Sequence, residues 1–295
     1  MSSFKRKLKY LSKKIPDPST GVITGEKIQL LCDHFIGDKN DSSKNPLLWR
    51  KKFRWLHFEK LNAPFDNRHR IFCYTHVLWN MELLIEKLKW LKNPFVLILH
   101  SSDVSFTEEH LKLFDELPNL KKIFSQNVDV SHERLTPLPI GFANKEFAHG
   151  QLDLFNSIRR QEFKKTNRVY FNFKIENNIE KRQDCYQKIS KKGLKFQTHI
   201  HLEDYFKALS TYKFAICPEG NGIDTYRFWE CLYLEVVPIC KKNLLAKYFA
   251  QDFPVILLDD WDDLDISSLD QTYDSFSWDD LPKLDMRYYK ELFVL

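Results

Sequence analysis

One short stretch, PEGNGIDTYRFWE at residues 218–230, combines a glycine-containing loop with charged residues at helical spacing. Gly220 and Gly222 lack a Cβ, so the backbone there can adopt unusual conformations and approach a ligand closely. Arg227 falls in the first turn of the helix that follows, where unpaired N–H groups attract phosphate and a planar guanidinium matches two phosphate oxygens. Glu230 shares the helix face of Arg227 and can accept hydrogen bonds from ribose hydroxyls. The stretch predicts a site for a phosphorylated ligand that contains ribose.

Asp224 precedes this helix and is a candidate for its N-cap. A second interpretation stays open, because Arg227 and Glu230 could form a surface ion pair and Gly-Asn-Gly could be an ordinary turn. The residues expected to contact the ligand are Glu219, Gly220, Asn221, Gly222, Asp224, Arg227 and Glu230.

Polar side chains also follow other apolar runs of the chain. Asp103 comes just after the run FVLILH at 95–100. Its carboxylate could serve as a general base, or it could form an Asx turn or cap the next helix. His76 and His100 compete for the role of base because histidine titrates near neutral pH. Asn127 ends another apolar run and could hydrogen-bond the hydroxyl groups of a ligand.

These residues lie at the ends of segments that alternate between strand and helix patterns. We predict strands at 27–32, 70–75, 95–100, 121–125, 168–173, 194–199, 213–218, 236–240 and 254–258. We predict helices at 78–91, 107–116, 178–193, 202–211, 225–235 and 243–250, with Gly193 as a C-cap. Alternating strands and helices imply parallel sheets covered by helices, and ligands bind beyond the carboxyl ends of such strands.

The 295 residues suit two domains of ordinary size. We therefore expect an α/β fold with two Rossmann-like domains, residues 1–150 and 151–270, whose parallel sheets face a central cleft. The aromatic-rich segment 271–295 could pack back on the first domain or lie at the periphery of the second.

The composition excludes several classes of protein. Hydrophobic residues make up 43% of the chain, which allows a large core. The net charge of +5 is mild, so a nucleic-acid partner is not expected. The basic cluster at 5–14 could be a solvated terminus or a weak peripheral contact with an anionic membrane or polymer. The six cysteines form no CxxC pair, and no signal peptide or long apolar run is present, so we expect a cytoplasmic location.

The region 214–240 resembles the exostosin-like glycosyltransferases. The resemblance rests on a strand, a loop, a helix and a second strand that carry Cys217, Pro218, Gly220, Asp224, Arg227, Phe228, Trp229, Glu230 and Pro238. Weaker similarity extends over residues 70–245 through LILHSSD, FSQN, LPIGFAN and YFNF, with Arg182 near the last of these. The absence of the N-terminal anchor typical of many members indicates a soluble bacterial or viral version.

The resemblance implies a GT-B fold and an inverting transfer from a UDP-sugar, with xylose as one candidate sugar, to an oligosaccharide or glycoprotein acceptor. An inverting transfer needs a base, for which Asp103 is the first choice, and positive charge at the leaving diphosphate. Arg227 is expected to supply that charge first and Arg182 second, unless Arg182 is only an exposed helix charge. Glu219 is placed to contact hydroxyls of the donor sugar.

The resemblance also implies that neither a cofactor nor a catalytic metal is needed. The acidic run DDWDDLD at 259–265 could hold a divalent ion, but such runs are usually solvated, and this one is far in sequence from the loop. The alternative function is a non-catalytic carbohydrate-binding protein that retains the fold.

Overall fold

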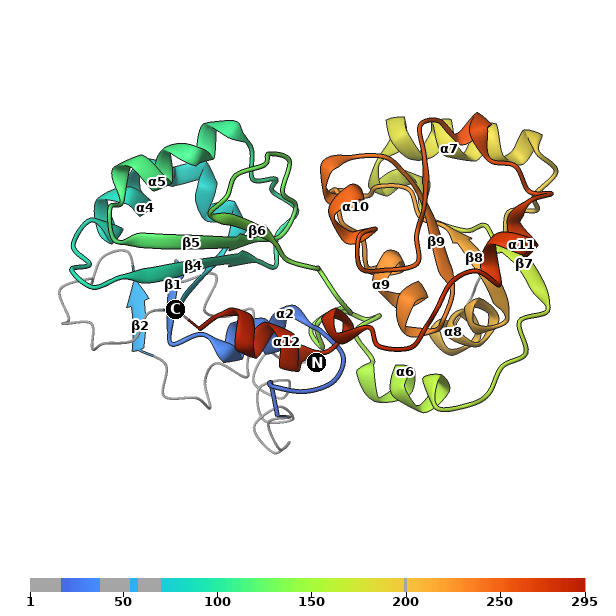
Figure 1. Ribbon diagram of the computed structural model, residues 1–295, viewed down its shortest axis with the longest axis horizontal. Helices are drawn as coiled ribbons and strands as arrows, with labels where there is room; N and C mark the ends of the chain where they lie inside the picture. Colours follow the sequence, from blue (N-terminus) through green and yellow to red (C-terminus); the bar gives the residue numbers. More distant parts are fainter. Residues whose placement is uncertain (1–16, 38–53, 58–69, 199–200, 295) are drawn as a thin grey trace, which may run out of the picture. The chain divides into compact units, whose positions relative to one another are not determined.

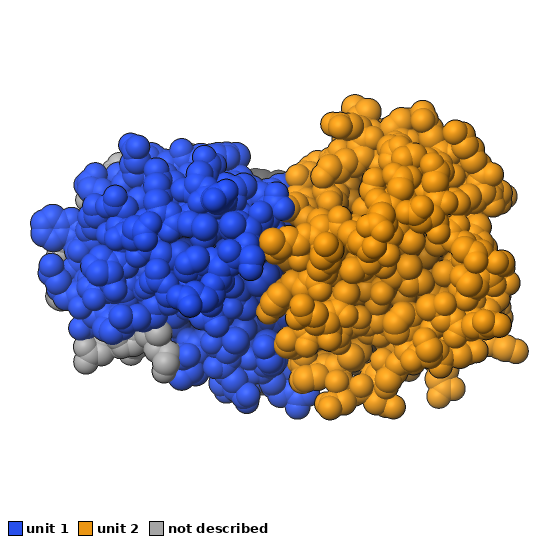
Figure 2. Space-filling view, turned by 45° about the horizontal axis from the view of Figure 1, so that its top comes forward, with its two compact units in different colours: residues 1–138, 285–295 blue, residues 139–284 orange. Residues whose placement is uncertain are grey.

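The computed structural model describes residues 17–37, 54–57, 70–198 and 201–294. The chain divides into two compact units, one formed by residues 1–138 and 285–295 and the other by residues 139–284 (Figure 2). The basic cluster at 5–14 lies outside the described residues. Within the described part of the chain, no helix is both long enough and apolar enough to cross a membrane.

The first unit is built on a six-stranded sheet in which all neighbouring strands are parallel (Figure 1). Its strands, in the order β2-β1-β3-β4-β5-β6, are β1 (His34–Gly37), β2 (Arg54–His57), β3 (Arg70–Tyr74), β4 (Phe95–His100), β5 (Leu120–Ser125) and β6 (Leu135–Pro137). Its helices are α2 (Gly25–Leu31), the 3₁₀ helix η2 (Thr75–Asn80), α4 (Met81–Leu88), the 3₁₀ helix η3 (Glu108–Leu111), α5 (Lys112–Glu116) and α12 (Met286–Leu292).

Helices cover both faces of this sheet, as Figure 1 shows for α4 and α5 on one side and α2 and α12 on the other. Strand β4 is buried along its whole length, as expected for a strand between two helical layers. Ile28 of α2 and Met286 of α12 share one apolar cluster with Phe72 and Ile98 of the sheet. The last helix of the chain therefore belongs to the core of the first unit.

The strand predicted at 27–32 is wrong, because residues 27–31 belong to helix α2 and Cys32 follows its end. The side chain of Thr24 caps this helix by accepting a hydrogen bond from the backbone N–H of Lys27. All seven residues of the helix are buried, so the sequence shows no amphipathic spacing there. A short apolar run without such spacing fits a strand and a helix equally well.

The second unit contains a four-stranded parallel sheet with the order β10-β9-β8-β7. Its strands are β7 (Asn167–Tyr170), β8 (Tyr212–Ile216), β9 (Val237–Lys241) and β10 (Ile256–Leu258). Its helices are α6 (Leu152–Arg159), η4 (Ile175–Asn177), α7 (Ile179–Lys191), α8 (Leu202–Ser210), α9 (Tyr226–Tyr233), α10 (Leu244–Phe249), η5 (Trp261–Asp263), α11 (Leu269–Tyr273) and η6 (Pro282–Leu284). The expected α/β fold with two parallel sheets is thus confirmed.

The core of the second unit places α7 against the sheet through Cys185 and Ile189, which cluster with Phe214 and Ile239. Gly193 has a φ of +80° just beyond α7, as its predicted role at the end of the helix requires.

The predicted strand at 194–199 is wrong over its described residues, 194–198, which form no strand. The segment instead runs beside the end of β7, where the backbone N–H of Gln197 donates to the carbonyl of Phe171 at 2.7 Å. The ring of Phe196 packs against Phe171 with 4.9 Å between centroids. Aromatic packing holds the segment against β7. Its apolar residues resemble those of a strand, which explains the wrong prediction.

The division between the units falls at Leu138–Pro139, whereas the sequence predicts the first boundary near residue 150. Of the segment 271–295, the part up to Leu284 belongs to the second unit and the part from Asp285 to the first. Helix α6 carries only two buried residues, Phe155 and Ile158, which is why its sequence reads as a polar helix at a domain boundary.

Candidate functional site

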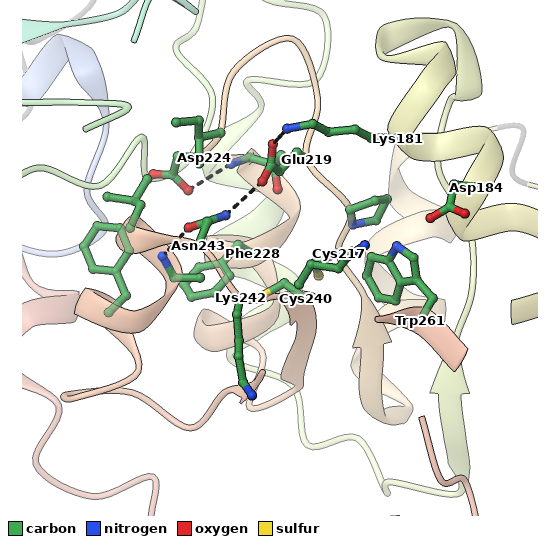
Figure 3. Close-up of a pocket in the computed structure, with 17 residues that line it drawn as sticks. Lys181, Asp184, Cys217, Glu219, Asp224, Phe228, Cys240, Lys242, Asn243 and Trp261 are labelled. Atoms are coloured by element: carbon green, nitrogen blue, oxygen red, sulfur yellow. Dashed lines mark hydrogen bonds and ion pairs between the residues drawn. The ribbon is translucent and has the colours of Figure 1, made fainter. Parts of the chain in front are cut away.

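The loop Pro218–Gly222 follows β8 at the carboxyl edge of the second sheet. It borders a cavity of about 360 Å³, whose wall also includes the residues that follow β9 (Figure 3). Among the lining residues are Lys181, Cys217, Pro218, Glu219, Asp224, Phe228, Lys241, Lys242, Asn243 and Trp261. A cavity of this size, lined by lysine, carboxylate and amide side chains and by aromatic rings, can hold a small organic ligand.

Four side chains hold the loop in one conformation. Arg182 donates through Nε to the carbonyl of Glu219 at 2.8 Å, and Asn178 donates through Nδ2 to the carbonyl of Gly220 at 2.8 Å. The carboxylate of Glu219 pairs with Lys181 and accepts from Nδ2 of Asn243 at 2.9 Å (Figure 3). The loop is therefore fixed before any ligand binds, which lowers the entropy cost of binding.

Neither glycine of this loop is needed for its backbone conformation, and Gly220 matters because it has no side chain. The described glycines with positive φ are Gly21, Gly141 and Gly193, so neither Gly220 nor Gly222 needs the left-handed region. A Cβ on Gly220 would lie 2.9 Å from Nη2 of Arg182. The absence of this side chain lets the guanidinium lie directly against the loop.

Arg227, in the first turn of α9, is partly buried and packs against two tyrosines. Its guanidinium carbon lies 4.7 Å from the ring centre of Tyr205 and 5.1 Å from that of Tyr170. Its Nη1 donates to the carbonyl of Asn172 at 2.8 Å, and its Nε donates to the hydroxyl of Tyr205. Cation–π contacts and charge-assisted hydrogen bonds together hold this arginine in one orientation.

Arg182 is buried, so the alternative of an exposed helix charge is wrong. Its Nη1 donates to the carbonyl of Lys174 at 2.7 Å. Burial and the positive charge of Arg227 lower the pKa of Arg182. Neither Nη2 atom donates a hydrogen bond to any residue that the structure describes. Two fixed cations with available donors can bind an anion, whose charge would offset their repulsion.

Glu230 lies on the same side of α9 as Arg227. The hydroxyl of Tyr205 donates to its Oε2, which is 3.7 Å from Nε of Arg227. Its Oε1 accepts no hydrogen bond from the described residues. Since the side chain is almost buried, the ion pair with Arg227 is not a surface pair. One carboxylate oxygen thus remains available to accept from a ligand hydroxyl.

Asp224 is not the N-cap of α9, because Thr225 occupies that position. The Asp224 carboxylate is buried and accepts from the backbone N–H of Ile140 at 2.6 Å and of Thr225 at 2.8 Å. It also accepts from Nε1 of Trp229 at 2.9 Å. Burial raises the pKa of this carboxyl to about 7 against these donors. Asp224 therefore ties the segment before α6 to the start of α9, and it also borders the cavity.

The candidates at the ends of β3, β4 and β5 belong to the first unit. Asp103 is exposed and forms no hydrogen bond with any described residue, so the Asx turn considered for it is absent there. It lines a second, open cavity that follows β3 and β4. His100 is buried and contacts Ser101, while Nδ2 of Asn127 donates to the carbonyl of Ser102 at 3.1 Å. His100 and Asn127 thus support the loop that carries Asp103.

The acidic run at 259–265 is occupied by hydrogen bonds and ion pairs. Asp260 caps η5 and pairs with Lys188 at 2.8 Å and Lys241 at 3.2 Å. The backbone N–H of Asp262 and the ammonium of Lys188 lower the pKa of Asp260. Across the described residues, no group of three or more His, Cys, Asp or Glu side chains is arranged to hold a metal ion.

Sequence reasoning missed the residues that position the two arginines and the loop. Tyr205 and Tyr170 support Arg227, and Asn178, Lys181 and Asn243 hold the loop. A signal existed for Asn178 and Asn243, since each precedes a helix and caps it through its side chain. No comparable pattern marks Tyr205, which comes from α8 and reaches the site only through the fold.

Comparison with known proteins finds no match by sequence and low similarity to a solved structure. No family model matches the chain, and no curated protein matches it. Among solved structures, the chain is similar to one described as "OtsA apo structure", with a TM-score of 0.48 and 11% sequence identity. The similar region covers 80% of this chain and 74% of that chain. The exostosin-like family therefore stays a prediction.

Proposed function

We propose that this chain is a glycosyltransferase that binds the nucleotide diphosphate of an activated sugar at the carboxyl edge of the second sheet. The observation that carries the proposal is a pair of guanidinium groups, each with an available Nη2. Arg182 is buried and holds the loop 218–222, and Arg227 is partly buried, with 18% of its side chain exposed, in the helix that follows this loop. A diphosphate leaving group gains negative charge as the glycosidic bond breaks, and fixed cations stabilise that charge.

The surrounding groups fit the other parts of a nucleotide sugar. Glu230 offers one carboxylate oxygen to a ribose hydroxyl. Glu219 lines the neighbouring cavity, where sugar hydroxyls could donate to its carboxylate. Two α/β units with parallel sheets are the architecture of GT-B enzymes, which agrees with the exostosin-like motif at 214–240.

Within this proposal the donor is a UDP-sugar, xylose being one candidate, and the acceptor is a hydroxyl of an oligosaccharide or glycoprotein. The transfer inverts the anomeric centre, with Asp103 as the base that removes the acceptor proton. This role is supported by the position of Asp103, whose exposed side chain lines a cavity. The arginines replace a metal ion as the source of positive charge.

Calorimetric titration of the full chain with UDP, GDP and ADP tests the proposal. We expect UDP to bind, and we expect Arg227→Lys and Arg182→Lys each to weaken binding by about tenfold or more. A lysine has no planar guanidinium whose Nε and Nη1 can keep the protein contacts while Nη2 faces the phosphate. Arg168→Lys is the matched control, because Arg168 is half-exposed and pairs with Asp270 away from the loop. Wild-type protein that binds no nucleotide would overturn the proposal.

A glycan array incubated with UDP-sugars separates transfer from binding alone. Transfer of label from a UDP-sugar to a glycan supports the transferase. Binding of both UDP and glycans without transfer or donor hydrolysis would support the non-catalytic alternative.

A further inference from the structure

The first unit contains a second open cavity, of about 1000 Å³, at the carboxyl edge of its sheet. Its wall comes from η2 and α4 after β3, from the loop after β4, and from η3. The lining residues that matter here are Trp79, Glu82, Asp103, Glu109, His110 and Lys112. Parallel sheets bind ligands at this edge, so the cavity is in the place where a substrate is expected.

Trp79 is the feature of this cavity that indicates the kind of ligand. Its side chain is 80% exposed although indole is among the most apolar groups in proteins. An exposed aromatic ring beside a cavity offers a flat apolar face, and the C–H face of a sugar ring can stack on such a surface. Trp90 is also exposed, at 72%, but does not line the cavity.

Trp79 has one aromatic neighbour, and hydrogen bonds fix the loop that carries Asp103. The ring of His76 stacks on Tyr74 with 5.6 Å between centroids, and its centroid lies 6.0 Å from that of Trp79. In the loop after β4, Ser101 adopts a φ of 60° and its N–H donates to Oε1 of Gln126 at 3.0 Å. Backbone strain held by hydrogen bonds is common where a loop presents a functional side chain, here Asp103.

The charges of the cavity indicate which saccharides it accepts. Glu82, Asp103 and Glu109 face the cavity with one lysine, Lys112. Burial lowers the pKa of His110, which favours the neutral ring, and its Nδ1 accepts from the backbone N–H of Thr107 at 2.9 Å. The excess of carboxylates can accept hydrogen bonds from sugar hydroxyls but repels an anionic sugar.

We propose that this cavity is the acceptor subsite of the transferase and that it binds uncharged saccharides, with Trp79 as the stacking surface. The acceptor role of this cavity rests on the proposed function. Saccharide binding by the cavity depends only on residues of the first unit. The proposal restricts the possible acceptors to uncharged glycans and excludes glycans rich in uronates.

Saturation-transfer NMR on the full chain measures the binding of methyl glycosides of neutral hexoses and pentoses and of the matching uronates. We expect neutral glycosides to bind wild type and Trp90→Ala equally. We expect Trp79→Ala to bind about tenfold more weakly, equivalent to about 1.4 kcal/mol, and Trp79→Phe to recover part of the loss because it keeps a ring. The double variant Glu82→Gln, Glu109→Gln should bind uronates more tightly than wild type does.

Equal binding by Trp79→Ala and wild type would overturn the inference. So would uronates that bind wild type as well as their neutral counterparts do, or a panel in which no glycoside binds. UDP titration of the same samples keeps the two proposals distinct. Trp79-dependent glycoside binding without UDP binding rejects the transferase and retains the saccharide site, while the reverse result rejects only the saccharide site.

Discussion

Gly220 leaves room for the guanidinium of Arg182, whose Nη2 would lie 2.9 Å from a Cβ at that position. In Gly220→Ala the end of the arginine side chain must shift, because the loop itself is pinned by Asn178 and Asn243. We expect the fold to survive and UDP affinity to fall by about tenfold, since the displaced guanidinium is a proposed diphosphate donor. Calorimetric titration of the variant with UDP measures this.

Gly193→Ala is the matched control for that experiment. Gly193 has a φ of +80° and nothing within 4 Å of its Cβ position, so alanine strains the backbone without touching the site. The variant should lose about 1 kcal/mol of stability and keep its affinity for UDP. If Gly193→Ala weakened UDP binding as much as Gly220→Ala, the close packing of Arg182 would not explain the effect.

Asn243 has two separable roles, because its Oδ1 caps α10 through Ala246 N–H at 2.7 Å while its Nδ2 donates to Glu219. Asn243→Ser keeps a capping oxygen but loses the donor to Glu219, whereas Asn243→Ala loses both. Urea unfolding should show a loss of about 1 kcal/mol in the alanine variant and much less in the serine variant. Affinity for a UDP-sugar should fall in both, and a serine variant with wild-type affinity would remove Glu219 from the donor site.

Tyr205 connects Arg227 to Glu230 through its hydroxyl. Tyr205→Phe keeps the ring beneath the guanidinium but removes the group that orients both charged side chains. We expect KM for the donor to rise by about threefold to tenfold, the usual net value of one hydrogen bond, with little change in stability. Tyr273→Phe, which removes a hydroxyl that donates to Glu235 at 3.0 Å, should leave KM unchanged. Equal kinetics of wild type and Tyr205→Phe would contradict this role.

How far the sequence could predict this structure depends on whether local pattern or tertiary packing decides each element. Strand β4 and helix α7 were predicted because burial on both faces and helical spacing are visible in the letters. Helix α2 was not, since its residues are buried all round and its identity depends on packing against α12. The spacing of apolar residues along the chain could not show that residues 25–31 form a helix and not a strand.

The site divides in the same way. Arg227 and Glu230 were predicted together because three residues along a helix fix their relative position. The role of Asp224 was misjudged, since its partners include the N–H of Ile140, which is remote in sequence. Tyr205 was missed for the same reason, because α8 brings it beneath Arg227 only in the folded unit.

Metal independence is a separate prediction, based on the supply of positive charge by arginines. If Arg182 and Arg227 stabilise the leaving diphosphate, transfer should proceed unchanged after treatment with EDTA. The measurement is the initial rate of transfer with EDTA, with added manganese and with neither. Loss of activity with EDTA and its recovery with manganese would assign the charge to a metal ion instead.

The buried carboxyl of Asp224 predicts a pH dependence of stability. Burial raises its pKa from 3.8 to about 7 although Ile140, Thr225 and Trp229 donate to it. Between these values the folded protein retains a proton that the unfolded chain has released, so the free energy of unfolding decreases as pH rises, by up to about 1.4 kcal/mol per pH unit. Urea unfolding of wild type and Asp224→Asn across this window measures the difference. The asparagine variant should lack this decrease, whereas Asp270→Asn, which changes an exposed carboxylate paired with Arg168 and Lys213, should retain it. A wild type whose pH dependence equals that of Asp224→Asn would mean that the Asp224 carboxyl is already ionised throughout this range.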